Sequence, residues 1–159
     1  MVKTAAISED GAYRYLLARD WSVGDRILWI MLNPSTADAN VDDPTIRRCI
    51  RFSRDWGFGS MEVVNLFALR STDPQHLAHR PDADGGAQNR MYVLDAMADA
   101  QLSVAAWGAH KMVRSSKLRT EVEARSPWCL GVTKDGYPRH PLYVAAATEP
   151  VPLSHARRH

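Results

Sequence analysis

The sequence has little cysteine and no long apolar run. Cys49 and Cys129 are the only cysteines among 159 residues. Two are too few for a four-cysteine zinc or iron–sulfur site, so they are expected to be buried thiols in a reducing compartment. No apolar segment is long enough to cross a membrane, and the N-terminus lacks a basic-then-apolar signal pattern. We therefore expect a soluble cytoplasmic protein with no membrane partner.

Net charge is also low. The formal charge is only +2, which neither requires nor excludes a nucleic-acid partner, so the positions of the basic residues matter more than their number. The chain length suits one domain over residues 1–159 with a core that needs no disulfide. We expect that domain to be a monomer.

The stretch from Ile27 to Leu32 is a run of six apolar residues. It predicts a strand buried on both faces of a parallel sheet. The run stops at Asn33-Pro34, and small polar side chains follow: Ser35, Thr36 and Asp38. Ligands of open α/β sheets bind at the carboxyl ends of such strands. The polar cluster is therefore a candidate site, although a turn with local caps would explain the same residues.

The rest of the chain alternates between strand and helix patterns. We expect an antiparallel edge strand over 12–19, buried strands over 26–32, 61–67, 102–108 and 128–132, and helices after Asp43-Pro44 and over 87–100 and 109–124. This order predicts an α/β fold with three layers, α/β/α, around a central four-stranded, mostly parallel sheet, with the N-terminal strand added antiparallel at one edge.

Three further polar motifs occur at predicted strand ends. Asn65 lies inside an apolar run, the Trp107-Gly108-Ala109-His110 motif follows the third strand, and the His140-Pro141-Leu142 motif follows the fourth. Together with Met31-Leu32-Asn33-Pro34-Ser35, these motifs resemble those of the uracil-DNA glycosylase superfamily, in the family's order, over roughly residues 26–143. The chain is most similar to a bacterial branch with a Met-Leu-Asn-Pro-Ser-Thr-Ala-Asp signature. It departs from the family where Met31 replaces a glycine and where the last motif lacks Ser-Pro.

The resemblance implies a monofunctional DNA glycosylase. Such an enzyme flips a nucleotide out of DNA and hydrolyses the bond between base and deoxyribose, leaving an abasic site. It implies no metal or organic cofactor, and we identify no lysine in the position of a Schiff-base nucleophile. The expected base is uracil or a hypermodified pyrimidine, such as one in phage DNA, so the role would be DNA repair or anti-phage defence.

The resemblance also implies roles for individual residues. Asn33 would hold the attacking water through its side-chain carbonyl, and Asn65 would read the base edge as both donor and acceptor. His140 would donate to the leaving base or bind a flanking phosphate, although a lone histidine is often structural. If a carboxylate activates the water, the nearest in sequence are Asp38, Asp42 and Asp43. Asp43 has a competing interpretation as a helix cap.

Further residues are expected to line the base pocket or to contact DNA. The pocket group consists of Ser35, Thr36, Asp38, Phe67 and Trp107. The DNA group consists of Arg47, Arg51, Lys134 and Arg139, with Leu142 and Tyr143 as candidates for the wedge that fills the gap left by the flipped base. The arginines of the first helix fit a solvated helix face equally well.

Two other functions remain open from the sequence. The chain could be a nucleic-acid-binding module that keeps this fold without the chemistry. It could also hydrolyse free nucleosides or nucleotides in the same crevice without a wedge.

Overall fold

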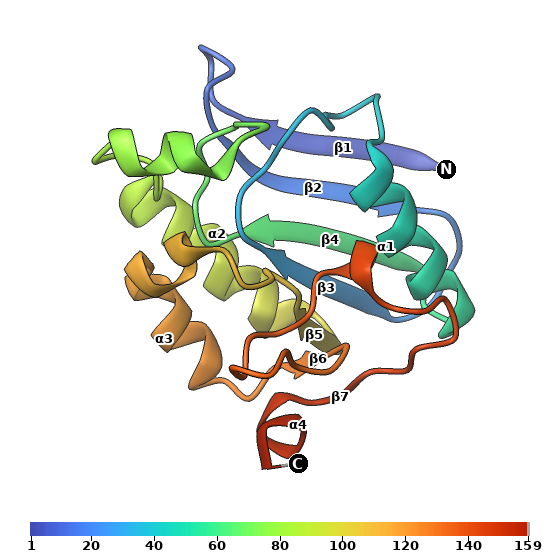
Figure 1. Ribbon diagram of the computed structural model, residues 1–159. Coiled ribbons are helices and arrows are strands. Elements are labelled where there is room, and N and C mark those ends of the chain that lie inside the picture. Colours follow the sequence, from blue (N-terminus) through green and yellow to red (C-terminus); the bar gives the residue numbers. More distant parts are fainter. Residues whose placement is uncertain (159) are drawn as a thin grey trace.

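The computed structural model describes residues 1–158, which form one seven-stranded sheet with helices beside it (Figure 1). The strands are β1 (Val2–Ile7), β2 (Arg14–Asp20), β3 (Arg26–Met31), β4 (Ser60–Asn65), β5 (Leu102–Ala105), β6 (Trp128–Cys129) and β7 (Val151–Pro152). The α-helices are α1 (Pro44–Asp55), α2 (Gly86–Asp99), α3 (Lys117–Glu123) and α4 (Leu153–Arg158). Three 3-10 helices complete the chain: η1 (Pro74–His79), η2 (Lys111–Ser115) and η3 (Pro141–Tyr143).

The sheet is mixed, with the strand order β1-β2-β4-β3-β5-β6-β7. β4, β3, β5 and β6 pair in parallel, whereas β1 with β2, β2 with β4, and β6 with β7 pair antiparallel. The α/β class predicted from the sequence is present. The expectation of a four-stranded, mostly parallel sheet is not confirmed, because antiparallel strands extend the sheet on both sides.

The prediction of an edge strand over 12–19 is wrong about its place in the sheet. This segment corresponds to β2, which lies between β1 and β4. Leu17 of β2 is fully buried, as expected of an interior strand. The edge position belongs to β1, whose side chains are exposed or only partly buried. The sequence analysis predicts no strand before residue 12, so it could not anticipate that β1 would pair with β2 and make it an interior strand.

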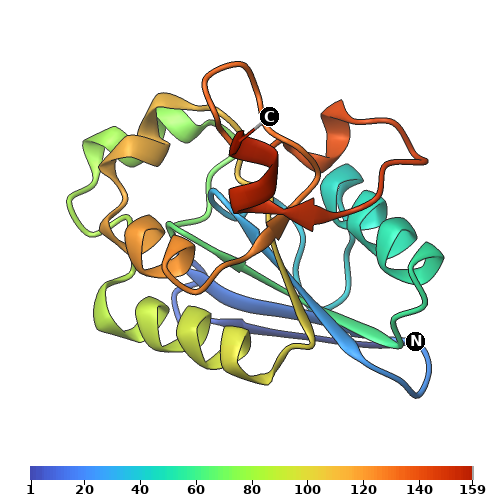
Figure 2. The ribbon, with the colours of Figure 1, turned by 90° about the horizontal axis from the view of Figure 1, so that it is seen from below.

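Two hydrophobic cores lie on opposite faces of the sheet, and β3 contributes to both because successive side chains point to opposite faces. Ile27, Trp29 and Met31 belong to the core under α1. Leu28 and Ile30 belong to the core that includes α2 and α3. Figure 2 shows α1 on one side of the strands and α2 and α3 on the other.

α1 begins where the sequence predicts. Asp43 accepts a hydrogen bond from the Ile46 N–H at 2.9 Å, and Pro44 occupies the first helical position. Ile46, Cys49 and Phe52 are buried on one side of the helix. The helix ends at Asp55, before Gly57 with a φ of +85°.

The helix predicted over 109–124 is divided in two. Ser116 has extended φ and ψ angles and caps α3 by accepting from the Arg119 N–H, so η2 and α3 are separate elements. The strand predicted over 128–132 is also shorter, since β6 ends at Cys129 and Gly131 has a φ of +98°. Among residues 1–158, no helix is long and apolar enough to span a lipid bilayer.

Candidate active site

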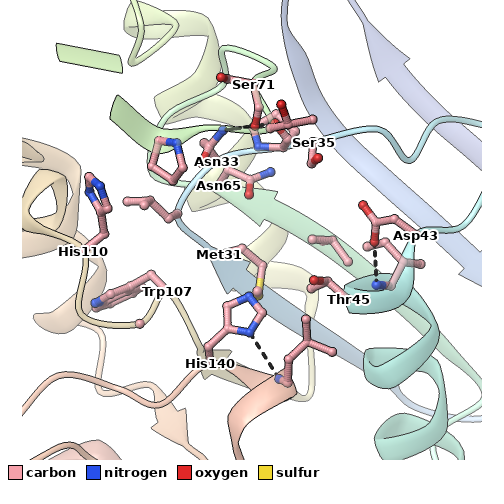
Figure 3. Close-up of a pocket in the computed structure, with 18 of the residues that line it drawn as sticks. Met31, Asn33, Ser35, Asp43, Thr45, Asn65, Ser71, Trp107, His110 and His140 are labelled. Carbon is pink, nitrogen blue, oxygen red and sulfur yellow. Dashed lines mark hydrogen bonds between the residues drawn. The ribbon is translucent and has the colours of Figure 1, made fainter. Parts of the chain in front are cut away.

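A cavity of about 620 Å³ lies at the carboxyl ends of the parallel strands (Figure 3). We call it the strand-end cavity. Its walls come from the segments that follow β3, β4, β5 and β6, together with the start of β2 and the start of α1. Most of the predicted site residues line it: Asn33, Ser35, Asp43, Asn65, Trp107, Arg139, His140, Leu142 and Tyr143. The strand topology therefore brings residues more than a hundred positions apart in the sequence to one cavity.

Asn65 is the last residue of β4 and is 1% exposed. Its backbone carbonyl accepts a hydrogen bond from Asn89 Nδ2 on α2, at 2.9 Å, which holds the end of the strand. Neither Nδ2 nor Oδ1 of Asn65 has a hydrogen-bond partner within the described residues. A buried amide without partners is costly. One donor and one acceptor are thus available to a ligand in the strand-end cavity.

Asn33 follows β3, and its amide orientation is determined by its neighbours. Nδ2 donates to the backbone carbonyls of Pro34 at 3.1 Å and Ser71 at 3.0 Å. Those carbonyls can only accept, so the NH₂ end of the amide must face them. Oδ1 is left without a partner in the part of the chain that the structure describes. It can accept a hydrogen bond from a water molecule or a ligand.

His140 precedes η3 and caps it. Its Nδ1 accepts from the Leu142 N–H at 3.1 Å, so the neutral ring carries its proton on Nε2. Burial lowers the pKa of His140, and the Asp43 carboxylate offsets this only in part. The imidazole is therefore neutral at physiological pH and can donate from Nε2.

Asp43 is the one predicted carboxylate that lines the strand-end cavity. It also caps α1, which confirms the helix-cap interpretation, while its role as the carboxylate that activates water stays a prediction. Asp38 instead accepts from the backbone N–H groups of Asn40 and Val41, and Asp42 pairs with Lys3 and Arg19. Asp38 and Asp42 thus have structural roles, in local hydrogen bonds and in ion pairs respectively.

Six predicted site residues lie outside the strand-end cavity. These are Thr36, Asp38, Phe67, Arg47, Arg51 and Lys134. Arg47 and Arg51 are exposed on the outer side of α1, as a solvated helix face would be, and Lys134 and Thr36 are exposed in loops. Phe67 belongs to the core that includes α2 and α3 and does not line the strand-end cavity. Thr36, Asp38 and Phe67 therefore do not line the cavity as expected. The DNA contacts expected of Arg47, Arg51 and Lys134 do not require them to line it and stay a prediction.

The rim of the cavity carries exposed side chains from one segment. Leu142 is 42% and Tyr143 78% exposed, and Arg139 is also exposed. The Tyr143 ring lies 5.4 Å from that of His140 between centroids. Arg48 of α1 donates to the Val144 carbonyl, which fixes this segment against α1. One aliphatic and one aromatic side chain thus project from a rim that is bonded to α1.

Several lining residues were not predicted from the sequence. Arg14, Thr45, Ser71 and His110 are among them. His110 enters the sequence prediction only as part of a motif, yet its Nδ1 caps η2 through the Met112 N–H at 3.1 Å, as His140 caps η3. Trp107, which was predicted, is 2% exposed and its Nε1 lacks a partner among residues 1–158. The turn signal Ser71-Thr-Asp-Pro74 could have indicated Ser71, but nothing local distinguishes Arg14.

Residues 1–158 hold no group of three or more His, Cys, Asp or Glu side chains suited to a metal ion. No curated protein and no solved structure matches the chain. A family model described as "Protein of unknown function (DUF1643)" matches residues 14–142. This range includes β2 to β6 and every residue that lines the strand-end cavity except Tyr143. Since the match covers most of the chain, the protein belongs to the DUF1643 family.

Proposed function

We propose that the protein is a monofunctional DNA glycosylase that hydrolyses the N-glycosidic bond of a damaged or modified pyrimidine and leaves an abasic site. The observation that carries the proposal is the unpartnered, buried amide of Asn65 in a cavity shared with Asn33 and His140. A pyrimidine edge presents adjacent donor and acceptor groups, which an amide can pair with simultaneously. The cavity volume of about 620 Å³ falls within the range of ligand pockets, roughly 300–1,000 Å³.

Hydrolysis would break the bond between C1′ of the sugar and the base nitrogen. The bonding electrons leave with the base, and a water oxygen forms the new bond to C1′ before its proton is released. The developing positive charge on the sugar and negative charge on the base both need stabilisation. Asn33 Oδ1 would orient the water. Asp43 would stabilise the sugar cation or accept the proton of the water.

His140 would stabilise the departing base. A neutral imidazole with its proton on Nε2 can donate to a base oxygen as that oxygen gains negative charge. The hydrogen bond from the Leu142 N–H to Nδ1 supports this tautomer. The lowered pKa of His140 keeps the ring neutral at pH 7.

The rim suits a flipped nucleotide better than a free nucleoside. A base inside a duplex is out of reach until it rotates outward, and an apolar side chain commonly fills the gap. Leu142 and Tyr143 project from the rim, where they would act as that wedge, and Arg139 would contact phosphate. DNA is accordingly the proposed partner and the cytoplasm the proposed location, with uracil or a hypermodified pyrimidine as the base.

The direct test uses oligonucleotides and phage DNAs that carry different modified bases. Alkali cleaves abasic sites, so a gel reveals which base is removed. We expect Asn33→Ala and Asn65→Ala each to lower the cleavage rate by about a hundredfold or more, the loss typical when one fixed polar group of an active site is removed. The matched control is Asn40→Ala, because Asn40 is exposed and lies outside the strand-end cavity.

Other outcomes would support the rival functions. Salt-sensitive binding to DNA without abasic sites would indicate a binding module. Faster hydrolysis of free nucleosides than of oligonucleotides would indicate a nucleoside hydrolase. Cleavage at the parent rate by both the Asn33 and the Asn65 variants would refute the roles proposed for these two residues.

A further inference from the structure

Two arginines of β2 are almost completely buried, and only one of them has a counter-ion. Arg19 is 0% exposed, and its Nε donates to Asp42 Oδ1 at 2.8 Å. Arg14 is 2% exposed, and no carboxylate lies within 4.0 Å of it among residues 1–158. Its guanidinium makes one hydrogen bond to these residues, from NH1 to the Ala37 carbonyl at 3.0 Å, and its Nε has no partner among them.

The direction of β2 explains why Arg14 lines the strand-end cavity. β2 runs antiparallel to β4, so its first residue lies near the end of β4, where Asn65 is located. Arg14 and Asn65 thus reach the cavity from neighbouring strands. A parallel strand in this place would present its last residue instead.

The guanidinium group of Arg14 remains charged. Burial lowers the pKa of Arg14 to about 10, which the Asp43 carboxylate opposes and the nearby Arg70 and Arg19 reinforce. The group is therefore a cation at pH 7. A buried cation without an ion pair is destabilising, and an anion that enters the cavity would relieve that cost. The Asp43 carboxylate reduces this cost only by longer-range attraction. It makes no ion pair with Arg14, and its Oδ1 accepts a hydrogen bond from the Ile46 N–H at the start of α1.

The other unpartnered atoms of the cavity are mostly donors. Of the fully buried atoms, Arg14 Nε, Trp107 Nε1 and Asn65 Nδ2 can donate, and Asn65 Oδ1 can accept. Asn33 Oδ1 is a second acceptor, which the proposed function assigns to the attacking water. A ligand that satisfies this set must carry more acceptors than donors. An unmodified uracil edge satisfies Asn65 but supplies no group dedicated to a guanidinium.

We propose that Arg14 determines substrate specificity by pairing with an anionic substituent, such as a carboxylate, carried on the flipped pyrimidine. The inference rests on the proposed glycosylase function and names the class of base that it would remove. A flanking DNA phosphate is the other possible source of an anion. The exposed Arg139 on the rim suits a phosphate, whereas the burial of Arg14 suits a group on the base itself.

The test measures binding of free bases, so it does not depend on cleavage. The probes are 5-carboxyuracil and 5-carboxamidouracil, which have similar shapes but differ in charge, and calorimetry or NMR titration gives their dissociation constants. We expect the protein to bind the carboxylate at least about tenfold more tightly, as for a charge-assisted hydrogen bond. In Arg14→Gln the dissociation constants for the two bases should become nearly equal. Arg125→Gln, just beyond the end of α3 and outside the strand-end cavity, is the control and should retain the preference.

Two results with the unmodified protein would overturn the proposal: equal affinity for both bases, or binding of neither base. Two results with Arg14→Gln would also overturn it: an undiminished preference for the carboxylate, or an equal loss of affinity for an unmodified trinucleotide. The last result would assign the anion to the DNA backbone. If Arg14→Gln fails to fold, Arg14→Lys takes its place, because lysine keeps the charge but lacks the planar fork of the guanidinium. The preference of the unmodified protein for the carboxylate over the amide then still tests the proposal. Base selectivity without any abasic-site formation would refute the glycosylase function alone.

Discussion

Hydrogen bonds to the backbone orient three side chains of the candidate site before any substrate binds. Asn33 is fixed by two carbonyls, His140 by the Leu142 N–H, and Asp43 by the Ile46 N–H. In each case the bond uses one end of the side chain and leaves another polar atom available. Such fixed polar groups need little reorganisation during a reaction, which is a large part of how active sites stabilise charge.

Protonation of His140 is expected to destabilise the folded protein. Burial lowers its folded-state pKa below the ordinary value of about 6.5. Between these two pKa values the unfolded chain binds the proton and the folded chain does not, so stability falls as pH decreases through that window. The protonated ring would also present an N–H to the Leu142 N–H.

A His140→Asn variant tests this expectation, because asparagine can still accept the Leu142 N–H but does not titrate. Urea unfolding at pH 7.5 and pH 5 should show a smaller loss of stability for the variant than for the unmodified protein. The remaining histidines are common to both proteins and serve as the internal reference. Identical losses would mean that His140 contributes nothing to the pH dependence.

At the scale of elements, α2 lies on the sheet face opposite α1 and holds the end of β4. Asn89 is fully buried, and its Nδ2 reaches the Asn65 carbonyl at 2.9 Å. We expect Asn89→Ala to lower the free energy of unfolding by about 1–3 kcal/mol, because a buried carbonyl loses its partner. If Asn65 reads the base, the variant should also raise KM more than it lowers kcat.

Gln88→Ala is the control for Asn89→Ala, since Gln88 is exposed on the same helix. Chemical denaturation measures the stability of both variants. An Asn89→Ala protein as stable as the Gln88→Ala protein would show that the bond between α2 and β4 has no net effect.

The elements differ in how well local sequence predicts them. β3 and β4 are apolar runs, and α1 has a cap, a proline and a helical apolar pattern, so each was predicted within a few residues. The division between η2 and α3 was not predicted, because the apolar pattern continues across Ser116 while the backbone does not. β7 has two residues and is defined only by its pairing with β6.

The residues of the candidate site also differ in how well local sequence predicts them. Asn33, Asn65 and His140 were found because each follows or ends an apolar strand, and one motif order relates them. Arg14 and Ser71 could not be found in this way. Arg14 reaches the cavity only through antiparallel pairing with a strand more than forty residues away, and Ser71 acts through its backbone carbonyl, which no side-chain pattern records.

At the scale of the whole molecule, antiparallel strands protect both sides of the parallel centre. β1 covers β2, and β7 covers β6. Uncovered strand edges pair readily with other chains. We expect a chain that lacks residues 1–8 to self-associate, because β2 would then present its backbone groups and Arg19 would lose the Thr4 carbonyl.

Light scattering coupled to size-exclusion chromatography measures this directly over a range of protein concentrations. A Val2→Lys variant is the control, since Val2 is 63% exposed and the change leaves β1 in place. A truncated chain that keeps both its size and its urea midpoint would show that β1 is dispensable.

The register of β2 also has a consequence for how this family can diversify. β2 contains an irregularity opposite Ala6 and Ile7, beside Arg14 and Leu16. Since neighbouring residues of a strand face opposite ways, sliding β2 by one position would put Tyr13 or Tyr15 in the place of the guanidinium, but it would also turn the buried Leu17 and Arg19 to the other face. The cation in the cavity wall is therefore tied to the same register that fills the core, so a relative that changes this wall should do so by substitution at position 14 rather than by a shift of the strand.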